Sequence, residues 1–519
     1  MAADSREVAD LVLLGAKVIT NWRVLPRAEA IAVRNGSILA VGCDREIATM
    51  AGRHTDVVHC HGRSVTPGFH DAHIHLLACA NRRLSVDCSP AAVRSIHMLQ
   101  QVIRERAQSV PPGNWIRAGD YDEFYLAERR HPTRWDLDAA APDHPVKLQH
   151  RSHHACVFNT AALHLLGIHT GNSSHHSQVV ERDPLTREPT GLVYEYSSGA
   201  AEDVVPPVDE GDLRIALDQV LQELLIHGIT SVQDASYRNG LPEWNRFREV
   251  RSEDTLRPRI RFMVGMPHLG DFVERGMGPG FGDERLSVGG VKIMLTETGE
   301  SFHPSPETLF EQVWQAHRNG YQVSIHAVEE STICVAIEAL AAAMSRHQGQ
   351  SHRIEHCSVL PPPLLDRLSE LRIGVTTNPG FLYHSGDRYL EEVEPHVRGW
   401  LYPIRSLLNK RVTVAAGSDA PVSSQNPLEG VYAAVTRLSR AGQVVGEAEK
   451  VTVEEALSLY TLGAAMVGLQ EHRMGSIEPG KLADLVVLST DLTAVDPGDI
   501  KDVEVDTTII GGKVAFWRR

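Results

Sequence analysis

The sequence predicts a protein of the α/β class built on a (β/α)8 TIM barrel. Three observations lead to this prediction. Strand-like runs alternate with helical patterns through the middle of the chain, strands dominate both ends, and one connection is far longer than the others. We therefore expect a small β-sandwich domain formed by both termini, and an insertion after the first barrel strand.

Both ends of the chain read as short strands. Leu11–Ile19 is apolar and rich in β-branched residues, and Asn35-Gly36 further on is a strong hairpin signal. Near the other end, Ala483–Leu488 has the pattern of a buried strand. We expect the two ends to combine into one β-sandwich domain that covers residues 1–64 and 470–519.

Eight strand-like runs lie between the two ends, and helical patterns such as Leu213–Leu225 separate them. Strand–helix alternation implies a parallel sheet, and eight units fit a closed barrel over residues 65–469. A doubly wound open sheet is the structural alternative. The predicted strands are Phe69–His75, Ile229–Val232, Ile260–Val264, Gly290–Met294, Gln322–Ile325, Arg353–Ile354, Ile373–Thr376 and Val412–Ala415.

The first connection differs from the rest, because the second predicted strand begins only at Ile229. We expect an insertion over residues 80–210. It contains strand-like pieces of its own, Pro145–Leu148 and Gly191–Tyr194.

Composition narrows the class of function. The 519 residues carry a formal net charge of −15, which argues against nucleic-acid binding, because phosphates require a basic face. The seven cysteines are odd in number and include no CxxC pair, which argues against a disulfide framework and a thiolate zinc site. We find no signal peptide and no membrane span, and we expect a cytoplasmic protein that binds no membrane.

Polar residues that bind metals recur where predicted barrel strands end. The first strand carries His73 and His75, whose spacing places both rings on one face. The other positions are Lys292, His326, His356 and Asp419. Taken singly, each has an ordinary structural explanation as a satisfied core histidine, an ion-paired lysine or a loop aspartate. Because barrel enzymes keep their chemistry at the carboxyl ends of the strands, the joint pattern predicts a site for a divalent metal.

Two segments resemble the amidohydrolase superfamily: Pro67–His75, similar to its first-strand signature, and Gly475–Leu488, similar to its return into the β-sandwich. More narrowly, the chain resembles the YtcJ-like branch, or amidohydrolase 3 family, which includes N-substituted formamide deformylases. The segments that support the branch are Arg151–Asn159, Pro189-Thr190-Gly191, Arg353–His356 and Gly417–Val422.

The resemblance implies a role for each site residue. His73 and His75 would bind a first, more buried metal, and His326 and His356 a second. A carboxylated Lys292 would bridge the two metals. Asp419 would contact the first metal and act as general base and then general acid. His154, from the insertion, would bind the substrate or polarise its carbonyl.

The chain departs from the branch at two places. Where the branch often has Asp-Gly after the lysine, this chain has Thr296-Glu297. Where it commonly has Ala-x-Gly-Asp after the fifth-strand histidine, this chain has Ala327–Glu330. Both segments should lie at the barrel mouth, and the substrate is therefore less well defined than the metal site.

The expected reaction is hydrolysis of a carbon–nitrogen bond in an amide, N-formyl compound, carbamate or cyclic amide other than an ordinary peptide. The metal, expected to be zinc and one or two ions per chain, would lower the pKa of water to about 7 to give hydroxide. Asp419 would then pass the proton to the leaving nitrogen, a contribution of roughly 10²–10⁴-fold.

Two other functions remain open. The motif His326-x-x-Glu329 fits a mononuclear deaminase of an aminated heterocycle on the same barrel, although such an enzyme has no use for a bridging Lys292. A catalytically silent barrel that only binds a ligand is the second alternative. The aromatic residues of Leu382–Ser385 and Trp400–Tyr402 would either line a substrate pocket or pack a loop. By analogy with the superfamily, we expect a small-molecule substrate and a homodimer.

Overall fold

The structure is a computed structural model that describes residues 7–168, 179–194, 204–251, 255–299, 301–347 and 349–518. The polar residues 1–6 at the start of the first predicted domain lie outside these residues. The chain divides into two compact units. One consists of Met1–His75 with Leu221–Arg519, and the other is Leu76–Val220. In the part of the chain that is described, no helix is long and apolar enough to cross a bilayer.

Eight parallel strands form the centre of the first unit, and each overlaps one of the eight predicted runs. Neighbours in this sheet follow the chain order, with the short insertion strands left out, which gives a TIM-barrel-like α/β fold. The strands are β8 (Phe69–Ile74), β15 (Ile229–Asp234), β16 (Arg259–Gly265), β17 (Leu286–Met294), β20 (Val323–Ala327), β21 (Arg353–His356), β22 (Gly374–Thr377) and β23 (Val414–Ala416).

The first and last strands meet through the loop that follows β23. Asp419 donates its backbone N–H to the carbonyl oxygen of His73 at 2.7 Å, and His75 donates to Ala420 at 2.9 Å. Gly417 makes the approach feasible, since a Cβ there would lie 2.6 Å from the Cβ of His73. Backbone contacts of these loop residues thus join the two ends of the sheet.

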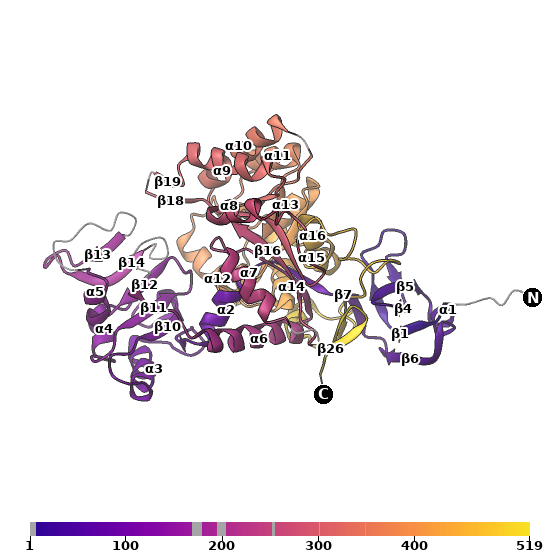
Figure 1. The fold of residues 1–519 in the computed structure, drawn as a ribbon, viewed down its shortest axis with the longest axis horizontal. Helices are drawn as coiled ribbons and strands as arrows, with labels where there is room; N and C mark the ends of the chain where they lie inside the picture. The colour runs from indigo at the N-terminus through magenta and orange to yellow at the C-terminus, as the bar shows by residue number, and fades with distance from the viewer. Residues whose placement is uncertain are drawn as a thin grey trace, which may run out of the picture. The chain divides into compact units, whose positions relative to one another are not determined.

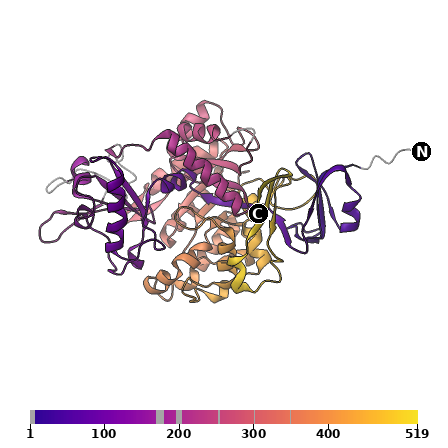
Figure 2. The same ribbon diagram turned by 90° about the horizontal axis from the view of Figure 1, so that it is seen from below.

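Helices cover the outside of the strands. The predicted helix Leu213–Leu225 lies within α6 (Glu210–Ile226). In α9 (Pro306–Arg318), Ser305 caps the first turn, and the buried side of the helix is apolar except for His317. Figure 2 shows helices from the middle of the chain (magenta) and from its later part (orange) on opposite sides of the strands.

Strands from the two ends of the chain share a sheet. Figure 1 shows β7 close to the C-terminal strands, and Val65 in β7 pairs with Val487 in β24. The predicted Asn35-Gly36 turn joins β4 to β5, with both residues at positive φ. Two sheets result, one of β5 (Ser37–Gly42), β4 (Ala30–Arg34), β1 (Ala9–Leu14) and β6 (Ala51–His59), the other of β26 (Lys513–Trp517), β25 (Val505–Ile510), β24 (Leu485–Leu488), β7 (Ser64–Pro67), β2 (Lys17–Ile19) and β3 (Arg27–Ala28).

The second unit has its own sheet and its own apolar core. Its buried residues include Leu99 from α3 (Ile96–Ser109) and Leu148 and Val157 from the sheet. The predicted pieces Pro145–Leu148 and Gly191–Tyr194 overlap two of its strands. The sheet consists of β9 (Val86–Asp87), β10 (Ile116–Tyr121), β11 (Val146–His150), β12 (Ala155–Phe158), β13 (Val179–Arg182) and β14 (Pro189–Tyr194).

Candidate functional site

Four histidines gather at the carboxyl ends of three barrel strands. The ring centroids of His73 and His75, at the end of β8, lie 5.2 Å apart. His356, at the end of β21, lies 4.8 Å from His73 and 4.7 Å from His326, which belongs to β20. Positions that are far apart in the sequence therefore contribute rings to one place.

Asp419 lies among these rings. Its Oδ1 is 2.9 Å from Nε2 of His75 and 3.4 Å from Nε2 of His73. His73, His356 and Asp419 are all buried, and their potential ligand atoms lie within 4.8 Å of one another. Burial acts to raise the pKa of Asp419, but its contact with His75 and the charges of the histidines outweigh burial and lower it. The carboxylate is therefore ionised at neutral pH.

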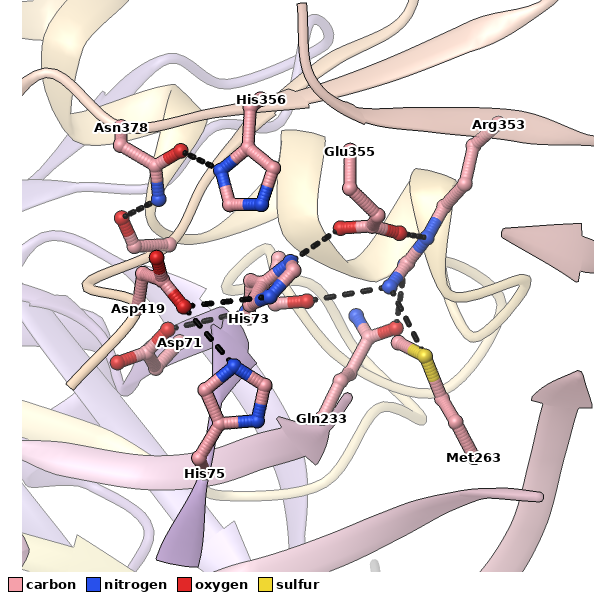
Figure 3. Close-up of polar contacts among 12 residues, drawn as sticks. Asp71, His73, His75, Gln233, Met263, Arg353, Glu355, His356, Asn378 and Asp419 are labelled. Atoms are coloured by element: carbon pink, nitrogen blue, oxygen red, sulfur yellow. Dashed lines mark hydrogen bonds and ion pairs between the residues drawn. The ribbon is translucent and has the colours of Figure 1, made fainter. Parts of the chain in front are cut away.

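Two of the rings are held by their Nδ1 atoms (Figure 3). Nδ1 of His73 donates to Oε2 of Glu355 at 2.5 Å, and Nδ1 of His356 donates to Oδ1 of Asn378 at 2.7 Å. Asn378 is itself oriented, because its Nδ2 donates to the carbonyl of Gly417 at 2.9 Å. Each ring therefore keeps the Nε2 lone pair that a metal requires.

The site fits a divalent metal by a test that is independent of the sequence motif. Nε2 of His73 and Nζ of Lys292 are two of several buried polar side-chain atoms of the described residues that have no hydrogen-bond partner, and Nε2 of His73 lies 3.4 Å from Oδ1 of Asp419. Buried polar atoms are rarely left in this state unless an ion or a water belongs there. Burial lowers the pKa of Lys292 to about 8, and burial with the charge of Lys292 lowers the pKa of His73. Neutral imidazole and carboxylate are the donors that zinc prefers.

Several residues of the site were not predicted from the sequence. Oδ1 of Asp71 accepts hydrogen bonds from the backbone N–H groups of His73, at 3.1 Å, and Ser418, at 3.0 Å. Glu355 and Asn378 orient the two histidines. The available signal was polar residues inside or just after strands that should face an apolar barrel interior.

His154 lies in the second unit, in the turn before β12, where its backbone N–H donates to Oγ of Ser152 at 3.3 Å. Its role toward the substrate stays a prediction.

Another cluster of potential ligands, Asp122, Glu123 and His150, lies in the second unit, but its chemistry differs. The backbone N–H of Ser152 donates to Nδ1 of His150 at 3.2 Å, so the proton of the neutral ring is on Nε2, which faces Glu123 at 2.8 Å. Arg151 lies 3.2 Å from Asp122. His150 and Arg151 thus each contact one of the two carboxylates of this cluster.

Loops beyond the strands complete the surroundings. Tyr402 is buried in a cluster with Leu382 and Leu401, and the partly buried rings of Tyr383 and Tyr389 pack against this cluster, which favours loop packing over a pocket lining for these residues. The departures from the branch lie in neighbouring loops. Thr296-Glu297 belongs to β18 (Thr296–Thr298), which follows β17, and Glu297 contacts Ser331 near the start of α10 (Glu330–Arg346).

Comparison with known proteins agrees with this arrangement. The sequence model of the amidohydrolase family matches residues 56–516. The chain is 28% identical to the N-substituted formamide deformylase of Arthrobacter pascens over 99% of both chains. It is 28% identical to the protein YtcJ of Bacillus subtilis (strain 168), over 94% of this chain and 96% of that one.

A solved structure supports the fold. An uncharacterized metal-dependent hydrolase from Pyrococcus horikoshii OT3 superposes with a TM-score of 0.75 at 24% identity, over 94% of this chain and 99% of that one. The predicted resemblance to the superfamily and to its YtcJ-like branch is confirmed. The chain belongs to the amidohydrolase family, and it is an amidohydrolase, an enzyme that acts on carbon–nitrogen bonds.

Proposed function

We propose that this enzyme hydrolyses the carbon–nitrogen bond of a small non-peptide substrate such as an N-formyl compound, an amide, a carbamate or a cyclic amide. The observation that carries the proposal is the convergence of His73, His356 and Asp419 around buried nitrogens that lack hydrogen-bond partners among the described residues. The similarity to a formamide deformylase over the whole chain supports this substrate class.

In this proposal, His73, His75 and Asp419 would hold one divalent metal, and His326 and His356 would hold a second. Lys292, if carboxylated, would supply oxygen ligands to the site; its pKa, lowered to about 8 by burial, increases the fraction of neutral amine that can react with carbon dioxide. When bound, the metal polarises the substrate carbonyl and lowers the pKa of water.

Asp419 moves the proton. Its carboxylate is ionised at neutral pH and accepts a proton from the attacking water. It then donates that proton to the leaving nitrogen. His154 contacts the substrate carbonyl and helps to stabilise the negative charge that develops on its oxygen.

The variant Asp419→Asn tests this role. It keeps the size of the side chain but cannot exchange the proton, so turnover should fall by about 10²–10⁴-fold. Metal content, measured by elemental analysis, should remain. Asp366→Asn, which changes an exposed aspartate paired with Lys410, is the matched control and should be fully active. Near-normal turnover of metal-loaded Asp419→Asn would refute the assignment of Asp419 as the residue that moves the proton.

The substrate class needs its own assay. A panel of N-formyl, N-acyl, carbamate and cyclic amide compounds should contain a substrate, and elemental analysis should find divalent metal in the purified enzyme. Ammonia release from aminated heterocycles with a single metal per chain would instead establish deamination. Protein that retains no divalent metal and turns over none of the panel would contradict the proposal.

Further expectations complete the proposal. The metal is zinc, and the enzyme is a homodimer, which light scattering during size-exclusion chromatography tests.

Residues 1–64 and 470–519 form a β-sandwich domain, residues 65–469 form the barrel domain, and residues 80–210 form its insertion. Shared burial of Leu13 and Val33 from one terminal sheet with Val65 and Leu485 from the other supports the sandwich.

A further inference from the structure

A buried ion pair lies inside the barrel, beneath the histidines. Arg353 and Glu355 are two residues apart on β21, so both side chains point to the same face of the strand. Both are fully buried, and Nε of Arg353 is 2.5 Å from Oε1 of Glu355. Barrel interiors are ordinarily filled by branched apolar side chains, and burying two ions is costly. A pair in this position therefore calls for a reason other than stability.

The guanidinium of Arg353 is fixed by contacts to other barrel strands. Nη1 donates to Oε1 of Gln233, in β15, at 2.6 Å, and Nη2 donates to the carbonyl of Ala72, in β8, at 3.2 Å. Gln233 is held in turn, because its Nε2 donates to the carbonyl of Ala464 at 3.1 Å. Arg353 therefore presents a rigid positive charge to Glu355 (Figure 3).

Glu355 connects this charge to the candidate metal site. Its Oε2 accepts the Nδ1 hydrogen of His73 at 2.5 Å, while Oε1 faces Arg353. The corresponding partner of His356 is the neutral amide of Asn378. The two histidines thus differ in the charge behind them. A carboxylate behind an imidazole fixes its orientation and makes its other nitrogen a better electron donor.

We propose that Arg353 and Glu355 are positioning residues that hold Nε2 of His73 toward the metal and make His73 a stronger ligand than His356. Arg353 fixes the position of Glu355 through the contact between Nε and Oε1, and Glu355 in turn orients His73 through Oε2. The inference rests on the proposed function, because it assumes that His73 binds a metal. The inference adds that retention of the metal depends on Arg353 and Glu355, which do not contact the metal themselves.

The test is Glu355→Gln, which keeps the shape and a hydrogen-bond acceptor but removes the charge. The metal-free protein is titrated with Zn²⁺ against a competing chelator, and the visible spectrum of Co²⁺-loaded protein reports the ligands directly. We expect Zn²⁺ affinity to fall by about 10–100-fold and the Co²⁺ spectrum to change. Arg353→Lys keeps a cation but loses the planar fork, and it should give a smaller loss in the same direction.

The matched control is a second buried ion pair at the opposite ends of the barrel strands. Asp484 accepts from Nε and Nη2 of Arg259 at 2.7 and 3.0 Å, where β16 begins. Asp484→Asn should lower the melting temperature and leave Zn²⁺ affinity unchanged. If Glu355→Gln does not fold, Arg353→Lys carries the comparison.

The outcomes separate this inference from the proposed function. If the wild-type protein binds no divalent metal, the proposed function fails and the inference fails with it. If the wild type binds Zn²⁺, and Glu355→Gln and Arg353→Lys bind it as tightly with unchanged Co²⁺ spectra, only the positioning role is overturned. A loss of affinity equal to that of Asp484→Asn would show a general effect of instability and would also overturn it.

Discussion

Arg437 offers a direct test of the packing beyond the seventh barrel strand. Its side chain is fully buried and donates to three backbone carbonyls, those of Val445 at 2.8 Å, Tyr402 at 2.9 Å and Leu401 at 2.8 Å. The oxygen of Tyr402 also accepts from Ile404, whereas the other two have no second donor among the described residues. The guanidinium thus holds the loop that carries Leu401 and Tyr402.

The variant Arg437→Met fills similar space but donates nothing. Two carbonyls would be left buried and unsatisfied, at about 1–3 kcal/mol each, which predicts a loss of about 2–6 kcal/mol. That is a large part of the roughly 5–15 kcal/mol that stabilises a typical protein. Arg437→Lys can reach fewer carbonyls, so its stability should lie between that of Arg437→Met and that of the wild type.

The assay is the melting temperature at a fixed scan rate, together with limited proteolysis of the segment between β22 and β23. Arg440→Met, a change of an exposed arginine three residues away, is the control and should melt like the wild type. If Arg437→Met melts at the wild-type temperature and resists protease equally, the three hydrogen bonds do not stabilise this segment and the reasoning is refuted.

Two further predictions concern closure of the barrel and acid stability. Gly417→Ala places a Cβ 2.6 Å from that of His73, so it should lower the metal content and should lower turnover by about 10²-fold. Gly399→Ala, where the added Cβ meets no atom within 4 Å, is the control and should change neither metal content nor turnover. Burial lowers the pKa of His352 to about 3. Because the unfolded chain protonates first, stability due to neutral His352 is present above about pH 6.5 and is lost as pH falls toward 3. His352→Gln should therefore flatten the fall in melting temperature between about pH 6 and 4, and an unchanged slope would contradict this role.

The barrel strands were predictable because burial on both faces leaves a short apolar run in the sequence. The residues at which the strands begin and end were harder to predict. β17 begins at Leu286, four residues before the predicted start at Gly290, because consecutive glycines do not show from the sequence whether a strand continues through them. A Cβ at Gly290 would lie 2.6 Å from the carbonyl oxygen of Gln322. The glycine allows close packing of neighbouring backbones, and a single sequence does not distinguish this from a turn.

The candidate site was predictable to the extent that its residues end strands. His73, His75, His326 and His356 lie together as their strand positions imply. The groups behind them were not predicted, because partnership between Glu355 and His73 depends on which side chains meet inside the barrel. Whether His154 faces the substrate depends on the placement of a separately folded unit, which strand periodicity does not specify.

The contact between β8 and the loop after β23 has a consequence for how the protein is made. Asp71 and Ser418 are 347 residues apart, and their hydrogen bond forms part of this contact. Contacts of such long range slow folding, because closing a long loop costs conformational entropy. On the ribosome, His73 and His75 emerge early but cannot meet Asp419 until almost the whole barrel has been synthesised. A chain that ends before Gly417 would carry all four histidines in an unfinished barrel but would lack Asp419, so the site is complete only once the last barrel strand and its loop have been made.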